Sequence, residues 1–284
     1  MILEARAKLN LYLDITGRRA DGYHLLETVM QSISLSDRIT LGIGGSGGIE
    51  VSCDDSSIPC GGSNTAYKAA AGFLKETGLS AGVSIAIEKR IPSGAGMGGG
   101  SADAAAVLAG LNRFFGGPLD SARLNALAAK IGADVPFCLA GGTKLCRGIG
   151  EEISAAPSVK DCRFLVVKPE FSCSTPLAYA RYDESLIQRR GGLEEFCAAV
   201  STGDFPPKMY NVFRELYADE RIDGIISRLK EHGAAGAMLT GSGAAVFGVF
   251  YDKNTAESAA NEFNGLFTAV CAPAEEGIRF VSTQ

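Results

Sequence analysis

A glycine-rich segment carries the most informative chemistry in the sequence. It runs from Pro92 to Asp103 as Pro-Ser-Gly-Ala-Gly-Met-Gly-Gly-Gly-Ser-Ala-Asp and leads into an expected helix. Glycine lets a backbone approach a ligand closely and adopt positive φ, while a helix N-terminus adds unpaired N–H groups and partial positive charge. Five glycines in seven positions exceed what a turn needs. We therefore interpret the segment as a phosphate-binding loop.

Two other glycine motifs can be tested against the same segment. Gly94, Gly96 and Gly99 satisfy the G-x-G-x-x-G fingerprint of dinucleotide-binding enzymes. That fingerprint requires a second parallel strand after the helix, whereas Pro118–Ile131 is predicted to be another helix. The polar Lys89-Arg90 pair also does not suit a buried first strand. A nicotinamide-dependent oxidoreductase is thus disfavoured, and a Walker A loop is excluded because no Gly-Lys-Ser/Thr occurs.

The elements that must position this loop form two sets. In the first half, Asn64 is expected to cap a helix ending near Thr77 before Gly78. Other first-half predictions are strands Leu9–Ile15, Asp37–Leu41, Ile49–Cys53 and Val83–Glu88, and helices from near Ser101 to Phe115 and Ser121–Ile131. Second-half predictions are strands Phe164–Lys168, Ala237–Thr240, Ala244–Tyr251 and Ala269–Ala272, and helices Ile222–His232 and Thr255–Phe267, the latter capped by Asn254. The second set has ferredoxin-like βαββαβ order. With Glu152–Asp161 as linker, we expect domains at 1–155 and 156–284.

Composition narrows the class of protein. The 284 residues carry a formal charge of −5, which argues against a broad nucleic-acid or membrane footprint. The eight cysteines show no Cys-x-x-Cys spacing and only two histidines are present, so neither a disulfide framework nor structural zinc is expected. Early charges at Glu4, Arg6 and Lys8 do not suit a signal peptide, and no long apolar run occurs. We expect a cytoplasmic protein.

The glycine-rich segment resembles the central motif of the GHMP kinases, the family of galactokinase, homoserine kinase, mevalonate kinase and phosphomevalonate kinase. Ala7–Leu11 resembles the family's N-terminal motif, and Leu239–Phe247 its C-terminal glycine loop. The resemblance implies an α+β GHMP kinase fold: an N-terminal mixed α/β domain (ribosomal protein S5 domain 2-like) and a C-terminal ferredoxin-like domain. It also implies an ATP-binding set: Pro92, Ser93, Gly94, Ala95, Gly96, Met97, Gly98, Gly99, Gly100, Ser101 and Ala102.

Within the family, Gly17–His24 and Gly132–Phe137 are similar to one branch in particular. That branch phosphorylates the 2-hydroxyl of 4-diphosphocytidyl-2-C-methyl-D-erythritol in the non-mevalonate isoprenoid pathway. The resemblance implies ATP with Mg²⁺ and a cytidine diphosphate-linked methylerythritol as small-molecule partners. No acidic residue must be a metal ligand, since Mg²⁺ is often held largely by phosphates and water. The sequence does not indicate an oligomeric state.

The family likeness gives two residues catalytic roles. Asp134 is the expected general base for the acceptor hydroxyl, with Lys8 lowering the pKa of that hydroxyl and keeping the carboxylate ionised. Taken alone, Asp134 would suit a helix N-cap, because Pro136 follows two residues later. Lys8 alone would suit an exposed strand position. Ser101 could contact phosphate or Mg²⁺, or simply cap its helix.

Five residues are expected to bind the acceptor: Asn10, Tyr23, His24, Thr175 and Tyr179. Asn10 would share a strand face with Lys8 and either contact substrate or satisfy a strand edge. The family likeness implies that Tyr23 and Tyr179 sandwich cytosine while His24 bonds its edge, and that Thr175 contacts a ligand oxygen. Tyr and His side chains also serve packing. The alternatives are another GHMP kinase, for homoserine, mevalonate or a sugar, and a non-catalytic protein with this fold.

Overall fold

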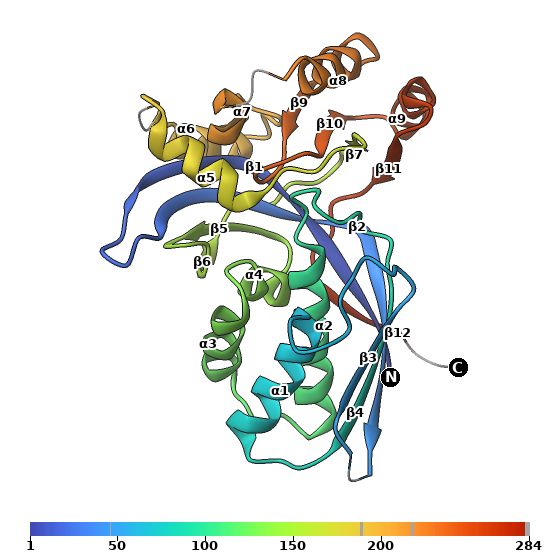
Figure 1. Ribbon diagram of the computed structural model, residues 1–284. Coiled ribbons are helices and arrows are strands. Elements are labelled where there is room, and N and C mark those ends of the chain that lie inside the picture. The colour runs from blue at the N-terminus through green and yellow to red at the C-terminus, as the bar shows by residue number, and fades with distance from the viewer. Residues whose placement is uncertain (46, 188–189, 217–218, 282–284) are drawn as a thin grey trace.

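Two β-sheets organise the chain in the computed structural model (Figure 1), which describes residues 1–45, 47–187, 190–216 and 219–281. The larger sheet has the strand order β12-β1-β2-β4-β3, with β5 paired to β2, β6 to β5 and β8 to β1. Its strands are β1 (Ile2–Arg18), β2 (His24–Gly44), β3 (Ile49–Cys53), β4 (Gly82–Glu88), β5 (Thr143–Arg147), β6 (Glu152–Ala155), β8 (Tyr210–Asn211) and β12 (Ile278–Val281).

The antiparallel β1 and β2 are much longer than the sequence predicts. The expected strand Asp37–Leu41 is only the second half of β2. The first half has no clear strand signal, because polar residues such as Gln31 and Ser32 interrupt its apolar pattern. These residues are buried nevertheless, since Ser32 N–H donates to the Gly142 carbonyl and Gln31 Nε2 donates to the Ala274 carbonyl. The Gln31 amide and the Ser32 backbone thus have partners in neighbouring loops, whereas the buried Ser32 hydroxyl has none among the described residues.

Helices α1–α4 cover one face of the larger sheet (Figure 1). They are α1 (Thr65–Thr77), α2 (Gly99–Phe114), α3 (Ser121–Ile131) and α4 (Val135–Ala140). The expected cap of α1 is confirmed, because Asn64 accepts from Ala66 N–H and Gly78 ends the helix at φ 70°. Helix α2 begins before the predicted Ser101, since Gly98 takes the N-cap position at φ 70°. Its alanine-rich face is buried, which lets it lie close to the sheet.

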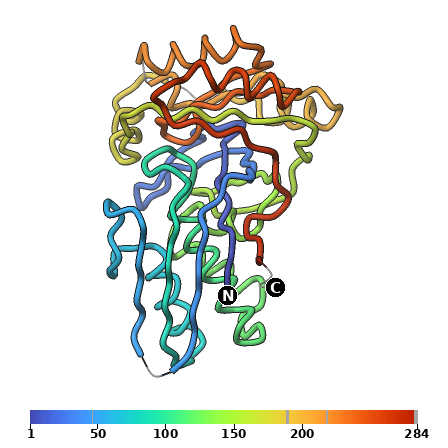
Figure 2. The backbone as a smooth tube through the Cα atoms, turned by 90° about the vertical axis from the view of Figure 1, so that its right-hand side faces the viewer, coloured from blue at the N-terminus to red at the C-terminus, as the bar shows by residue number. Residues whose placement is uncertain are grey.

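The second sheet has the ferredoxin-like order β11-β7-β10-β9, all antiparallel. Helices α8 and α9 lie on its outer face (Figure 2). This half contains β7 (Arg163–Lys168), α5 (Thr175–Glu184), α6 (Leu193–Ser201), α7 (Val212–Leu216), α8 (Glu220–Glu231), β9 (Gly236–Leu239), β10 (Val246–Phe250), α9 (Lys253–Ala260), a 3₁₀ turn at Asn261–Phe263 and β11 (Phe267–Cys271). The predicted cap Asn254 is wrong: Asp252 accepts from Thr255 N–H at 2.7 Å and caps a shorter helix.

The connection between the two sheets differs from the predicted linker. Residues Glu152–Ala155 form β6 instead, paired with β5. A division at residue 155 stays our proposal for the domain boundary. Two later segments, β8 and β12, nevertheless pair with β1 in the first sheet. None of the described helices has the length and apolar character needed to span a membrane.

Candidate active site

A cavity of about 1070 Å³ lies where the two sheets meet. It is bounded by β1, the glycine-rich loop, the start of α4, helix α5 and the loop between β9 and β10. All but one of the predicted site residues line it, although they are scattered over the sequence from Lys8 to Tyr179. The exception is Ala102, which is fully buried in α2. The fold therefore brings the predicted catalytic, ATP and acceptor residues into one space.

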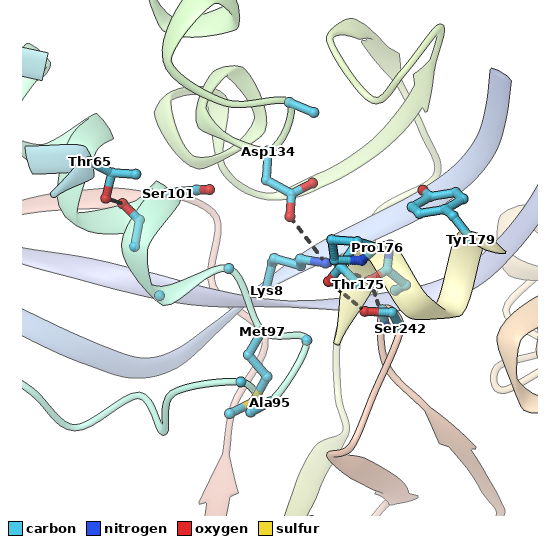
Figure 3. Close-up of a pocket in the computed structure, with 18 of the residues that line it drawn as sticks. Lys8, Thr65, Ala95, Met97, Ser101, Asp134, Thr175, Pro176, Tyr179 and Ser242 are labelled. Carbon is cyan, nitrogen blue, oxygen red and sulfur yellow. Dashed lines mark hydrogen bonds and ion pairs between the residues drawn. The ribbon is translucent and has the colours of Figure 1, made fainter. Parts of the chain in front are cut away.

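Lys8 and Asp134 face each other inside this cavity (Figure 3). Lys8 Nζ lies 3.4 Å from Asp134 Oδ2 and donates to Asn10 Oδ1 at 2.7 Å. The lysine is nearly buried, whereas 30% of the Asp134 side chain remains exposed. The opposite charges of the two groups attract each other at this distance. The pair thus presents an accessible carboxylate oxygen backed by a fixed positive charge.

Asp134 does not play the helix-capping role that we considered for it. Asp134 stands at the N-cap position of α4, and Pro136 occupies the first turn as expected. Its side chain makes no capping hydrogen bond, however, and its backbone is helical at φ −83° and ψ −11°. The carboxylate instead points toward Lys8 (Figure 3). The start of α4 thus sets the position of Asp134, but the side chain makes no capping hydrogen bond to that helix.

Both the oxygen and the nitrogen of the Asn10 side-chain amide form hydrogen bonds with other residues of the protein. Its Oδ1 accepts from Lys8 Nζ and from Gly241 N–H at 3.0 Å. Its Nδ2 donates to Thr28 Oγ1 at 2.9 Å, and only 2% of the residue is exposed. These bonds tie Lys8 to the C-terminal glycine loop. The geometry therefore favours a role in orienting Lys8 over the direct substrate contact that we expected.

The two glycine loops pack backbone against backbone. Gly96 has φ +74°, and a Cβ there would lie 2.3 Å from the Thr240 carbonyl oxygen. Ala245 N–H also donates to the Ala95 carbonyl at 3.2 Å. No side chain fits at Gly96, because backbone atoms cannot yield as a flexible side chain would. Part of the glycine excess thus serves loop–loop packing rather than ligand access.

The N-terminus of α2 opens into the cavity. Ala102 N–H makes the first helical bond, to the Gly98 carbonyl at 2.8 Å, so the amides of residues 99–101 precede the helical hydrogen bonds. The cap residue, Gly98, supplies no side-chain acceptor for them. Ser101 lies in the first turn and lines the cavity with its neighbours (Figure 3), so it is not the N-cap. This arrangement suits a phosphate group.

A side chain added at Gly98 should disturb the catalytic pair, Lys8 and Asp134. A Cβ at Gly98 would lie 3.1 Å from Lys8 Cγ and 3.7 Å from Asp134 Oδ2. We expect Gly98→Ala to lower kcat/KM by about 10-fold or more, because small displacements of reacting groups are costly. Steady-state kinetics with varied ATP would measure this.

Gly117→Ala is the matched control for that substitution. Gly117 also has positive φ, at +78°, but no atom of the described residues lies within 4 Å of the position that a Cβ would take there. Both variants carry a backbone strain of roughly 1–2 kcal/mol. Equal kinetic losses in the two variants would mean that strain alone, rather than contact with Lys8, causes the effect.

Aromatic side chains gather at the end of the cavity near α5. The His24 ring stacks on Tyr179 with centroids 4.7 Å apart, and His24 Nε2 lies 2.7 Å from Asp183 Oδ1. Tyr23 is 60% exposed at the rim. The predicted aromatic residues are thus together, but His24 covers one face of Tyr179. A base can stack on that face only if the His24 ring moves.

Sequence reasoning missed several residues that line the cavity. Ser242 Oγ lies 2.8 Å from Thr175 Oγ1 and joins the C-terminal glycine loop to the start of α5 (Figure 3). Ser242 lies within a recognised motif, so that motif is the available signal. Asp183, the partner of His24, follows Tyr179 by four residues on α5 and therefore faces the same way. Helical spacing could have indicated it.

Comparisons with known proteins agree with this geometry. Residues 64–142 match the profile of the GHMP kinases N terminal domain, and residues 193–269 match the GHMP kinases C terminal profile. The 4-diphosphocytidyl-2-C-methyl-D-erythritol kinase of Alkaliphilus metalliredigens is 41% identical over 272 residues, covering 93% of both chains. The enzyme of the same name from Caldicellulosiruptor saccharolyticus is 41% identical over 268 residues, covering 92% of both.

Solved structures of kinases are also similar to this chain. A crystal structure of a 4-(cytidine 5′-diphospho)-2C-methyl-D-erythritol kinase is 34% identical, with a TM-score of 0.79 over 96% of this chain and 99% of that one. The homoserine kinase of Cytophaga hutchinsonii has a TM-score of 0.78 over 98% of this chain and 96% of its own. At 18% identity, the second likeness concerns the fold alone.

Proposed function

Because the chain belongs to the GHMP kinases, and within them to the 4-diphosphocytidyl-2-C-methyl-D-erythritol kinases, we propose that its cavity aligns ATP and an alcohol acceptor for phosphoryl transfer. The protein is a phosphotransferase that moves the γ-phosphoryl group of ATP to the 2-hydroxyl of 4-diphosphocytidyl-2-C-methyl-D-erythritol, in the non-mevalonate isoprenoid pathway. The observation that carries the site assignment is the Lys8–Asp134 pair, which stands in one cavity with the glycine-rich loop.

Asp134 and Lys8 have complementary roles in the transfer. The Asp134 carboxylate accepts the proton of the acceptor hydroxyl as the hydroxyl oxygen bonds to the γ-phosphorus. The bond from that phosphorus to the bridging oxygen breaks at the same time, and ADP leaves with the bond's electrons. Lys8 stabilises the negative charge on the reacting oxygens. Phosphoryl transfer needs mainly this positioning and charge stabilisation from a protein.

The glycine-rich loop and the start of α2 hold the ATP phosphates. Their backbone N–H groups donate to phosphate oxygens, aided by the partial positive charge of the helix terminus. Mg²⁺ would be held at the same end of the cavity, chiefly by phosphate oxygens and water, and would neutralise phosphate charge there. Among the described residues, no cluster of three His, Cys, Asp or Glu side chains could hold a metal ion alone. The Ser101 hydroxyl, which lines this end of the cavity, would be one protein ligand for such an ion.

The aromatic end holds the cytidine group of the acceptor. Tyr23, His24 and Tyr179 supply flat surfaces and a ring edge, and Thr175 with Ser242 supplies hydroxyl groups between them and Lys8. The test is ADP formation by the purified protein with 4-diphosphocytidyl-2-C-methyl-D-erythritol, methylerythritol, homoserine and mevalonate. Activity should require the cytidine-linked acceptor, and CDP should compete with it but not with ATP. Equal activity on methylerythritol alone would contradict a cytidine site.

Removing the Tyr23 ring should weaken acceptor binding selectively. Stacking of a base on an aromatic ring is worth about 1–3 kcal/mol, so Tyr23→Ala should raise the KM for the acceptor roughly 5–150-fold. Because this contact is equal in ground and transition states, kcat should change little and the KM for ATP should stay the same. Phe114→Ala, which removes a half-exposed ring outside the cavity, is the control. A large fall in kcat for Tyr23→Ala would place Tyr23 at the reacting groups instead.

A further inference from the structure

A buried cluster of three charged side chains lies beside the glycine-rich loop. Lys89 Nζ forms ion pairs with Asp37 Oδ2 and, at 2.9 Å, with Asp103 Oδ2. The side chains of Lys89, Asp37 and Asp103 are 8%, 0% and 5% exposed. Their residues come from the end of β4, from β2 and from α2, so the cluster joins three elements. Lys89 and Asp103 also line the large cavity.

Stability alone is a weak reason to bury this cluster. Charged groups lose solvation when they are buried, and a buried ion pair is often no better than apolar side chains of similar size. Here two carboxylates share one ammonium, and Asp103 Oδ1 has no hydrogen-bond partner among the residues that the structure describes. Burial raises the pKa of the Asp103 carboxyl to about 7, against the attraction of Lys89. Such a cluster needs an explanation other than stability.

The cluster fixes both ends of the phosphate-binding loop. Asp37 Oδ1 accepts from Arg90 N–H at 2.6 Å and from Ile91 N–H at 2.8 Å, which holds the chain where it enters the loop. Lys89 reaches across to Asp103 in the second turn of α2, where the chain leaves the loop. A Cβ at Gly99 would lie 3.2 Å from Lys89 Nζ, so the ammonium sits directly against the start of α2.

We propose that Asp37, Lys89 and Asp103 form a clamp that positions the backbone N–H groups of the loop for the ATP phosphates. Glycines lose more conformational freedom on ordering than other residues, so a loop so rich in them gains most from fixed ends. These three are positioning residues, because they act on ATP through the loop. The inference rests on the proposed function, since it assumes that the loop binds ATP.

The test is the dissociation constant for ATP, measured by calorimetry without acceptor. Losing a hydrogen bond between charged groups should weaken ATP binding by roughly 10-fold or more in Asp103→Ala. Asp103→Asn keeps the shape and an acceptor oxygen, so its loss should be smaller. Binding of CDP should be unchanged in both variants. Asp14→Asn is the control, because Asp14 is also buried and accepts from Gly191 N–H, but outside the cavity.

Measuring the dissociation constant for ATP over a range of pH adds an effect that a purely structural role of Asp103 would not produce. Asp37, Lys89 and, from α4, Cys138 are the titratable groups that act on Asp103, and burial raises the pKa of the Cys138 thiol well above its ordinary value. Because burial raises the pKa of the Asp103 carboxyl, wild-type Asp103 becomes protonated and resembles asparagine as the pH falls through that pKa, and it is ionised above it. The ratio of the Asp103→Asn to the wild-type dissociation constant should therefore rise with pH, to about threefold where Asp103 is ionised.

The possible outcomes separate the clamp from the proposed function. Wild-type protein that binds no ATP would overturn both. Wild-type binding with an unchanged constant in Asp103→Ala, or an equal loss in Asp14→Asn, would overturn the clamp alone. If Asp103→Ala does not fold, Asp103→Asn decides, and an unchanged dissociation constant for ATP in that variant at the highest pH of the series would overturn the clamp.

Discussion

Asp134→Asn should fold normally, bind ATP and lose turnover by a factor of about 10²–10⁴, the usual contribution of a positioned general base. The amide keeps the size of the carboxylate but cannot accept the acceptor's proton. Folding should be unaffected because the Asp134 side chain makes no capping hydrogen bond and is 30% exposed. Single-turnover kinetics at saturating ATP and acceptor would measure the chemical step directly.

The matched control for Asp134 is an aspartate that does cap a helix. Asp120 accepts from Arg123 N–H at 2.8 Å at the start of α3. Asp120→Ala should cost about 0.5–2 kcal/mol of stability and leave turnover alone. Asp134→Ala should show the opposite pattern, with turnover lost and thermal stability kept. If Asp134→Ala behaves like Asp120→Ala, Asp134 is a structural residue.

Lys8→Met should lower kcat by about 10²–10³-fold, the effect of removing one group that stabilises charge in the transition state. Methionine fills similar volume without charge, so the β1 strand should remain intact. Asn10 would keep its bonds to Gly241 and Thr28, which hold the strand to the C-terminal loop. The KM for ATP should change much less than kcat, since the amides of the loop remain in place.

Lys144→Met provides the comparison for Lys8. Lys144 lies on β5 of the same sheet and outside the large cavity. Its replacement should leave kcat within about twofold of wild type, as surface changes remote from a site usually do. A Lys8→Met protein with normal kcat would remove Lys8 from the reaction. A melting temperature lowered in Lys8→Met alone would instead indicate a structural role for its ammonium.

The sequence alone predicted those features of the fold that are determined by residues close together in the chain. The cap at Asn64 and the stop at Gly78 are examples, because each acts within one helical turn. The glycine-rich loop was recognisable from residue type and spacing. The closeness of Lys8 and Asp134 was expected only from the family likeness, since nothing local links a strand residue to one so distant in sequence.

Features that depend on long-range pairing were not predicted. The polar Lys89 does not suit a buried strand, yet its side chain is buried because Asp37 and Asp103 neutralise it from other elements. The strands β5, β6, β8 and β12 were not predicted, and three of them (β5, β8 and β12) are held by pairing with the distant β1 or β2. The stacking of His24 on Tyr179 likewise depends on how α5 packs against the β1–β2 turn. Such contacts exist only in the assembled fold.

The pairing of β12 with β1 limits how early in synthesis the larger sheet can be completed. Ile2 pairs with Val281, so the strand that carries Lys8 has one neighbour that follows it directly in the chain, β2, and one that is made much later, β12. During synthesis β1 can pair with β2 first, and β8 then pairs with Tyr12 and Leu13 on its other edge, but the part of that edge at Ile2–Ala5 has no strand partner until β12 is made. Catalytic competence is therefore expected only once β12 has been made, and not in steps as each half is made.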